Sequence, residues 1–261
     1  KLFIELQQQP YKVRKDVNTA TPAFRNFAFF EAYFSNYIEG TIFEIEEAKS
    51  IIQTETPIPN RDEDSHDILG TYKLVSNQKE MNTTPSNPDE LLTLLQYRHQ
   101  LLLAARTSKK PGQFKDKNNR AGETHFVDHT LVRGTLMKGF DYYQALQEPF
   151  AKAAYIMFMI SEIHPFLDGN GRIARVMMNA ELVKSNQTRI IIPTVYRDDY
   201  LGALRRLTRN DDPAVYIRML QRAQEFSATL VANSMEALEN QLTQSNAFKE
   251  HDEAKLKILT K

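Results

Sequence analysis

The sequence predicts a mainly α-helical protein, a bundle around one buried central helix with a single small β-hairpin. Residues 148–163 are apolar on nearly their whole circumference, which is typical of a helix buried on most sides. Most of the remaining chain has apolar residues at helical spacing behind N-cap and proline start signals. Residues 109–130 break that pattern with two short extended runs about a turn, which predicts the hairpin.

Composition narrows the class of protein before any motif is considered. A chain of 261 residues can form one large or two small domains and needs no covalent staples for its core. The 33 Lys and Arg residues balance the 33 Asp and Glu residues, so no global field favours nucleic acid or an anionic membrane. The chain has no cysteine and no long apolar run, which excludes thiolate metal sites and fits a reducing compartment. We therefore expect a cytoplasmic protein, with neither membrane nor nucleic acid among its expected partners.

We expect three regions along the chain. The first, 1–85, is a helical region that begins with an extended arm. The second, 86–212, contains the hairpin and the buried central helix, and the third, 213–261, consists of C-terminal helices. In the first region we expect an arm over 1–20 and a helix over 21–38 with an aromatic inner face, closed by Gly40. A second helix over 41–52 follows a Thr41–Glu44 capping box, and a third helix covers 65–81.

Start signals place the remaining elements. Asn87 and Pro88 begin a helix whose buried stripe includes His99, which we interpret as a structural histidine. The central helix is expected over 148–163, and a helix that opens from a glycine-rich loop over about 170–183. An extended link over 190–193 is followed by three further helices over 197–209, 213–226 and 234–259.

The stretch from His164 to Arg175, HPFLDGNGRIAR, is neither ordinary core nor ordinary surface. Pro165 disfavours helical backbone at His164, so the central helix should end there and deliver an imidazole to a loop. The sequence Asp-Gly-Asn-Gly that begins at Asp168 tolerates strained backbone and opens into a second helix. A glycine-rich loop at a helix N-terminus offers N–H groups and positive potential, which together suit an anion.

The charged side chains of this stretch fit a polyphosphate. Arg172 and Arg175 share one face of the first turn, where the helix dipole disfavours positive charge by about 0.3–1 kcal/mol each, so an anion is expected beside them. Asp168 can hold Mg²⁺ together with substrate phosphates. His164, with an ordinary pKa of about 6.5, can accept a proton at neutral pH. Phosphoryl transfer, nucleotidyl transfer and ester hydrolysis could all use these parts, and the plain alternative is a helix–turn–helix link with solvated arginines.

The string resembles the signature of the Fic (Fido) family, His-Pro-Phe-x-Asp/Glu-Gly-Asn-Gly-Arg-x-x-Arg, at every fixed position. The resemblance implies a Fic-type helical bundle with a hairpin flap over the active site. It also implies a protein adenylyltransferase, which transfers AMP from ATP to a Ser, Thr or Tyr hydroxyl of a target protein and releases pyrophosphate. ATP is then the substrate, with Mg²⁺ as the cofactor.

The resemblance also implies a role for each matching residue. His164 would be the catalytic base and Asp168 the Mg²⁺ ligand. The implied nucleotide-binding residues are Gly169, Asn170 and Gly171 through their backbone, Arg172 at the β-phosphate, Arg175 at the γ-phosphate and Tyr200 near the adenine. For Tyr200, packing in the core is an equally open interpretation. Phe126 and Val127 of the hairpin would dock the target's backbone as an added strand, and the alternative for that segment is a surface loop.

A second motif, Ser35-Asn-Tyr-Ile-Glu39-Gly, is similar to the family's inhibitory pattern Ser/Thr-x-x-x-Glu-Gly/Asn. In members with an N-terminal inhibitory helix, termed class II, the glutamate pairs with the second signature arginine, here Arg175. The implied inhibitory helix covers about 21–39. Glu39 and a γ-phosphate would compete for one guanidinium, and about 1.4 kcal/mol shifts binding tenfold. The plain alternative is an exposed glutamate beside a capping glycine.

The leading hypothesis is an autoinhibited adenylyltransferase whose target protein is not specified by the sequence. Self-modification and a homodimer are both open. On the same site, removal of AMP from a modified protein or transfer of another phosphate-containing group is also open. A non-catalytic ATP-sensing interaction module is the alternative from a different class, although ATP binding alone needs no base at His164.

Overall fold

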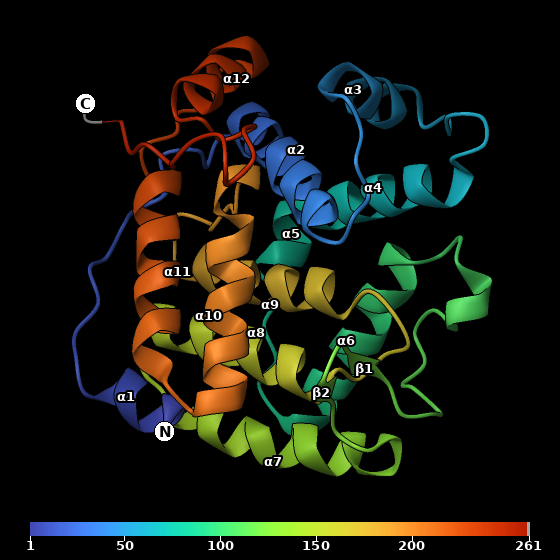
Figure 1. Ribbon diagram of the computed structural model, residues 1–261, viewed down its shortest axis with the longest axis vertical. Helices are drawn as coiled ribbons and strands as arrows, with labels where there is room; N and C mark the ends of the chain where they lie inside the picture. Colours follow the sequence, from blue (N-terminus) through green and yellow to red (C-terminus); the bar gives the residue numbers. More distant parts are fainter. Residues whose placement is uncertain (260–261) are drawn as a thin grey trace.

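A computed structural model describes residues 1–259 and shows a helical bundle with one small hairpin (Figure 1). Twelve α-helices occur in this part of the chain, with bounds α1 Leu2–Gln7, α2 Thr21–Ile38, α3 Ile45–Thr54, α4 Asp62–Val75, α5 Gln78–Met81, α6 Pro88–Leu102, α7 Val132–Ala145, α8 Pro149–Ile163, α9 Asn170–Lys184, α10 Arg197–Asn210, α11 Pro213–Ser227 and α12 Met235–Gln244. The two strands, β1 (Arg120–Ala121) and β2 (Thr124–His125), pair antiparallel. The predicted mainly helical class is confirmed.

The core lies between α8 and α9, which form the most extensive helix pair of the described residues. Helix α8 is the predicted central helix, and its apolar residues are buried from Phe150 to Ile163. Helix α9 is buried almost throughout, including both of its signature arginines. The loop between these two helices is therefore anchored at both ends in buried helices of the core.

Helix α2 packs against α4 and also contacts α9 (Figure 1). Its aromatic face is buried as predicted, because Phe27, Phe30 and Phe34 recur at helical spacing and pack inward. The helix ends where expected, with Gly40 at φ +90°, a conformation that favours glycine. This packing brings the end of α2 to the first turns of α9.

Several local expectations were wrong in the first region. The expected arm begins with a short helix, α1, because Leu2 and Leu6 are one turn apart and both bury. The capping box is three residues later than expected, with Glu44 as N-cap and Glu47 as its partner. The expected helix over 65–81 is two helices, since Asn77 caps a new start and interrupts the run.

Two differences concern the rest of the chain. Helix α7 was not predicted, because glycines at 134 and 139 weaken its pattern, yet Gly139 lets Met159 of α8 approach closely. The helix expected over 234–259 ends at Gln244, since Asn246 adopts φ +63° and the chain turns back on itself. None of the helices in residues 1–259 has the length and apolar character that a membrane crossing requires.

Candidate active site

The loop between α8 and α9 is fixed by its own residues. His164 caps α8 in the left-handed region, with φ 53°, and its N–H donates to Ile160 O at 2.9 Å. The Asn170 side chain closes the loop, because it accepts from Phe166 N–H at 2.8 Å and donates to Phe166 O at 2.9 Å. Gly169 has φ +75°, and a Cβ there would collide with Leu103. The predicted loop is present, and the Asn170 amide serves it as a structural group.

His99 of α6 holds the loop from the side. Its Nδ1 accepts from the Gly112 N–H at 2.9 Å, so the proton must be on Nε2, which donates to Asp168 O at 2.9 Å. The imidazole stacks on Phe166 with ring centroids 3.7 Å apart, and burial lowers its pKa to about 4. His99 is therefore a structural histidine, as expected, and it sets the position of the backbone at Asp168.

The His164 imidazole has a free basic nitrogen. Its Nδ1 lies 3.2 Å from Ser161 O, and because a carbonyl can only accept, Nδ1 carries the proton and Nε2 keeps its lone pair. Phe126 of the hairpin covers the ring face at a centroid distance of 3.7 Å. Burial lowers the pKa of His164 to about 4, below the ordinary value expected from the sequence. The group is neutral at pH 7, and it is a weaker base while it is covered.

Asp168 is partly exposed and lies at the start of α9. Its Oδ1 accepts from the Gly169 N–H at 2.7 Å, and Arg172 Nη2 is 3.7 Å away. No group of three or more His, Cys, Asp or Glu side chains suited to a metal ion occurs within residues 1–259. A magnesium ion here would take one protein carboxylate and complete its coordination with phosphate and water oxygens, which fits a metal that arrives with a nucleotide.

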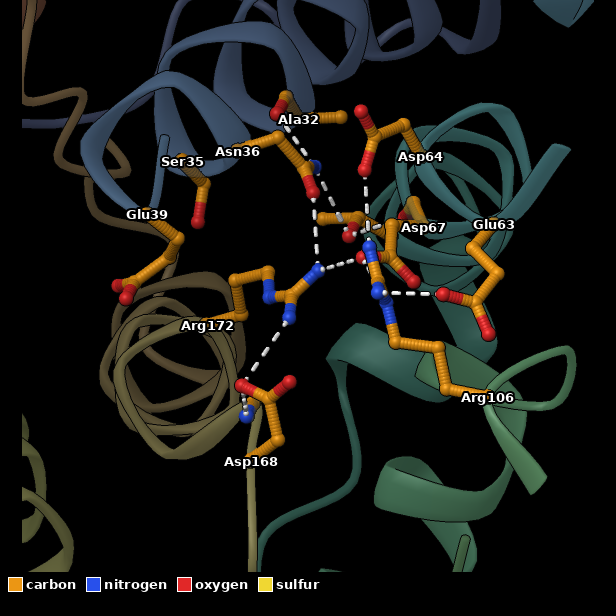
Figure 2. A network of polar contacts seen from close by, with 12 residues as sticks. Ala32, Ser35, Asn36, Glu39, Glu63, Asp64, Asp67, Arg106, Asp168 and Arg172 are labelled. Atoms are coloured by element: carbon orange, nitrogen blue, oxygen red, sulfur yellow. Dashed lines mark hydrogen bonds and ion pairs between the residues drawn. The ribbon is translucent and has the colours of Figure 1, made fainter. Parts of the chain in front are cut away.

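The two signature arginines meet different carboxylates, Arg172 that of Asp67 and Arg175 that of Glu39. Arg172 is buried and extends toward α4, where its Nη1 donates to Asp67 Oδ2 at 2.6 Å and to Asn36 Oδ1 at 3.3 Å (Figure 2). Its Nε is buried and has no hydrogen-bond partner among the described residues. A buried unpaired N–H of a cation is costly, so this side chain is suited to a further acceptor.

Arg175 is surrounded by acceptors of α2 and α10. Its Nε and Nη2 donate to Ser35 Oγ and O at 3.0 and 2.9 Å, and Nη2 also donates to Glu39 Oε1 at 2.6 Å. Nη1 donates to Tyr200 Oη at 3.1 Å. The cavity that Arg175 and Ser35 line has a volume of about 10 Å³, space for one water at most. The Nε–Nη2 edge of Arg175 is thus already bonded to protein acceptors, one of them a carboxylate.

Glu39 lies directly over the start of α9. A Cβ added to Gly171 would collide with Glu39 Oε1, so the carboxylate rests against the first turn of the helix. The N-terminal end of a helix favours an anion, and here the anion is a side chain of the same protein. The Glu39–Arg175 pair expected from the second motif is present, and the same carboxylate also covers the loop's glycine-rich turn.

The remaining predicted residues lie around this centre. The expected hairpin is present but shorter than expected, and its Phe126 covers His164 while Val127 is half-buried. Tyr200 is buried with its hydroxyl on Arg175, so contact with a nucleobase would require the site to open.

Four polar neighbours were missed by sequence reasoning. Lys115 is buried against the end of α8, where its Nζ donates to Ile163 O at 3.3 Å, and burial lowers its pKa to about 8. Asn36, Asp67 and Arg106 belong to the network around Arg172 (Figure 2). Asn36 and Asp67 come from α2 and α4, Arg106 and Lys115 from loops after α6, and the acidic run that contains Asp67 gave no local sign of a buried partner.

Comparisons with known proteins show similarity to Fic proteins. Residues 87–182 match the model of the Fic/DOC family. Two proteins named protein adenylyltransferase Fic are similar to the chain: that of Culex quinquefasciatus is 28% identical over 76% of the chain, and that of Drosophila willistoni is 26% identical over 82%. The chain spans 40% and 44% of the lengths of these relatives, less than half of each.

Solved structures show the same fold. Fic-1 (residues 134–508) of C. elegans has a TM-score of 0.68 at 18% identity, with 94% of this chain and 71% of that chain covered. A Fic domain containing signaling protein from Bacteroides thetaiotaomicron has a TM-score of 0.70 at 19% identity, covering 92% and 97% of the two chains. The predicted Fic-type bundle is thus confirmed as a fold.

Proposed function

We propose that this Fic/DOC family protein, distantly related to protein adenylyltransferases, transfers AMP from ATP to a hydroxyl of a target protein and is held inactive by Glu39. One observation supports both halves of the proposal most directly. The Glu39 carboxylate bonds Arg175 at 2.6 Å and covers Gly171, beside a neutral imidazole. An acidic side chain thus occupies the position that suits a terminal phosphate.

Each group of the site has one role in the proposed reaction. The hydroxyl of a Ser, Thr or Tyr attacks the α-phosphorus in line, its proton passes to His164 Nε2, and the bond to the pyrophosphate oxygen breaks. The N–H groups at the start of α9 and the two arginines bind the phosphates and offset the charge that develops. Asp168 would hold Mg²⁺ together with phosphate oxygens, and the ion would neutralise charge on the nucleotide and on the leaving pyrophosphate.

Inhibition follows from competition for Arg175. With Glu39 in place, the guanidinium's acceptors are all supplied by the protein, and a γ-phosphate would meet a carboxylate instead of a cation. Relief requires only that the end of α2 move or that Glu39 be removed. The same proposal divides the chain into three regions. Residues 1–85 contain the inhibitory helix, residues 86–212 contain the catalytic centre, and residues 213–261 form the C-terminal helices.

Incubation with α-labelled ATP and Mg²⁺ tests the proposal. We expect label on the protein itself or on proteins of a cell extract with Glu39→Gly, little with the unaltered chain, and none with the Glu39→Gly, His164→Ala double variant. If Glu39→Gly instead loses an ability to release AMP from labelled proteins, Glu39 is a participant in hydrolysis. ATP binding without product in any form would favour the nucleotide-sensing module.

A further inference from the structure

The two arginines of α9 differ in which part of the guanidinium is engaged. Nε and Nη2 together form the edge that holds a carboxylate or phosphate with two parallel hydrogen bonds. In Arg175 this edge is filled by Ser35 and Glu39 of the α2 end. In Arg172 the same edge is open within residues 1–259, because Nε has no partner there and Nη2 has only Asp168, at 3.7 Å.

The opposite end of the Arg172 guanidinium is held firmly. Its Nη1 donates to Asp67 Oδ2 at 2.6 Å, and Asp67 is 1% exposed. The same oxygen accepts from Arg106 Nε at 2.8 Å. Arg106 is in turn bound at 2.8 and 2.9 Å by Glu63 and Asp64, so one carboxylate of α4 lies between two arginines (Figure 2).

We propose that Asp67, secured by Arg106, is a positioning residue that turns the open Nε–Nη2 edge of Arg172 toward the phosphates of the nucleotide. This inference rests on the proposed function and adds a group that the signature does not contain. Asp67 acts only through Arg172, because it grips the Nη1 end and leaves the phosphate-binding edge unoccupied.

The geometry also indicates what happens without Asp67. Asp168 already lies 3.7 Å from Nη2, so a guanidinium released from Asp67 can swing onto this neighbour and form a closer ion pair. That movement would fill the open edge of Arg172 and would occupy the carboxylate that we assign to Mg²⁺. Loss of Asp67 therefore weakens binding of the nucleotide's β-phosphate, and it does so without any change at Arg175.

Calorimetric titration with Mg²⁺ and AMP, ADP or ATP tests the inference in a form that cannot turn over, Glu39→Gly with His164→Ala. Adding Asp67→Asn should weaken ADP and ATP about tenfold or more, a usual loss for a residue that orients a binding side chain, and leave AMP unchanged. Arg106→Gln, which loosens Asp67 without removing it, should give the same nucleotide pattern with a smaller loss. Glu80→Gln is the matched control. Glu80 forms an ion pair with another buried arginine, Arg98, at an N–O distance of 2.8 Å.

The outcomes separate this inference from the proposed function. Unchanged or tighter ADP binding in Asp67→Asn would overturn it, and tighter binding would make Asp67 a competitor for Arg172. Equal weakening of AMP, ADP and ATP, or the same loss in Glu80→Gln, would reduce Asp67 to a general stability role and also overturn it. If Asp67→Asn does not fold, the Arg106→Gln pattern decides. Absence of AMP transfer from Glu39→Gly, with the nucleotide pattern intact, would refute the proposed function and leave the positioning role standing.

Discussion

Replacing Glu39 by glycine should increase the affinity for Mg·ATP. The perturbation removes a carboxylate that bonds Arg175 at 2.6 Å and rests on the first turn of α9. It leaves a buried guanidinium with its Ser35 and Tyr200 contacts but without a counter-charge. A γ-phosphate can then supply that charge, whereas in the unaltered protein it must first displace Glu39.

The magnitude follows from the burial of the pair. The Glu39 side chain is 33% exposed and that of Arg175 is 6% exposed, so the contact is screened on one side only. A hydrogen bond to a charged group contributes about 1.5–3 kcal/mol net, and this is the free energy that ATP must overcome to displace Glu39. At about 1.4 kcal/mol for each tenfold, the dissociation constant should fall about tenfold to a hundredfold.

Isothermal titration of Mg·ATP into the His164→Ala background measures this change without turnover. Glu55→Gly is a suitable control, because Glu55 also caps a helix and forms a 2.8 Å ion pair, here with Lys73 in an exposed position. Equal ATP affinity in the forms with and without Glu39 would refute the competition argument, as would a similar gain in the control.

Four further predictions follow. His164→Ala in the Glu39→Gly form should lower the AMP transfer rate by about 10²–10⁴-fold while ATP affinity measured by titration stays the same, and an equal loss of both would contradict a role as base. Phe126→Ala should raise the pKa of His164 from about 4 toward 6.5, because water then reaches the ring, and an NMR pH titration of the imidazole would show whether it does. Gly171→Ala should destabilise the protein by about 1–3 kcal/mol in urea unfolding, because the added Cβ collides with the Glu39 carboxylate. The loss should be smaller in the Glu39→Gly form, and equal losses in both forms would contradict the contact between Glu39 and Gly171. The pKa of His99 is about 4 in the folded protein against an ordinary 6.5, so its neutral form contributes stability above pH 6.5. About 3 kcal/mol of that stability is lost as the pH falls toward 4, and His99→Gln should reduce the dependence of the unfolding free energy on pH over that window.

The sequence determined the features that depend on neighbouring residues. Pro165 ends the central helix at His164, and the glycines that follow open the next helix, so the loop between the two helices could be predicted from neighbouring residues. The position of Glu39 at a helix end could also be predicted, because Gly40 marks the end of that helix. Helix α7 was missed because Gly134 and Gly139 weaken its local pattern, while the close packing of Gly139 against Met159 of α8 is a tertiary contact that neighbouring residues do not reveal.

The partners of the charged groups depend on how the helices pack. Arg172 and Arg175 are three residues apart, which predicts one shared face, yet packing of α2 and α4 directs one to Asp67 and the other to Glu39. The lowered pKa of His164 likewise depends on Phe126, nearly forty residues earlier in the chain. Such effects arise because burial and ion pairing depend on distance in space, while a motif records only distance along the chain.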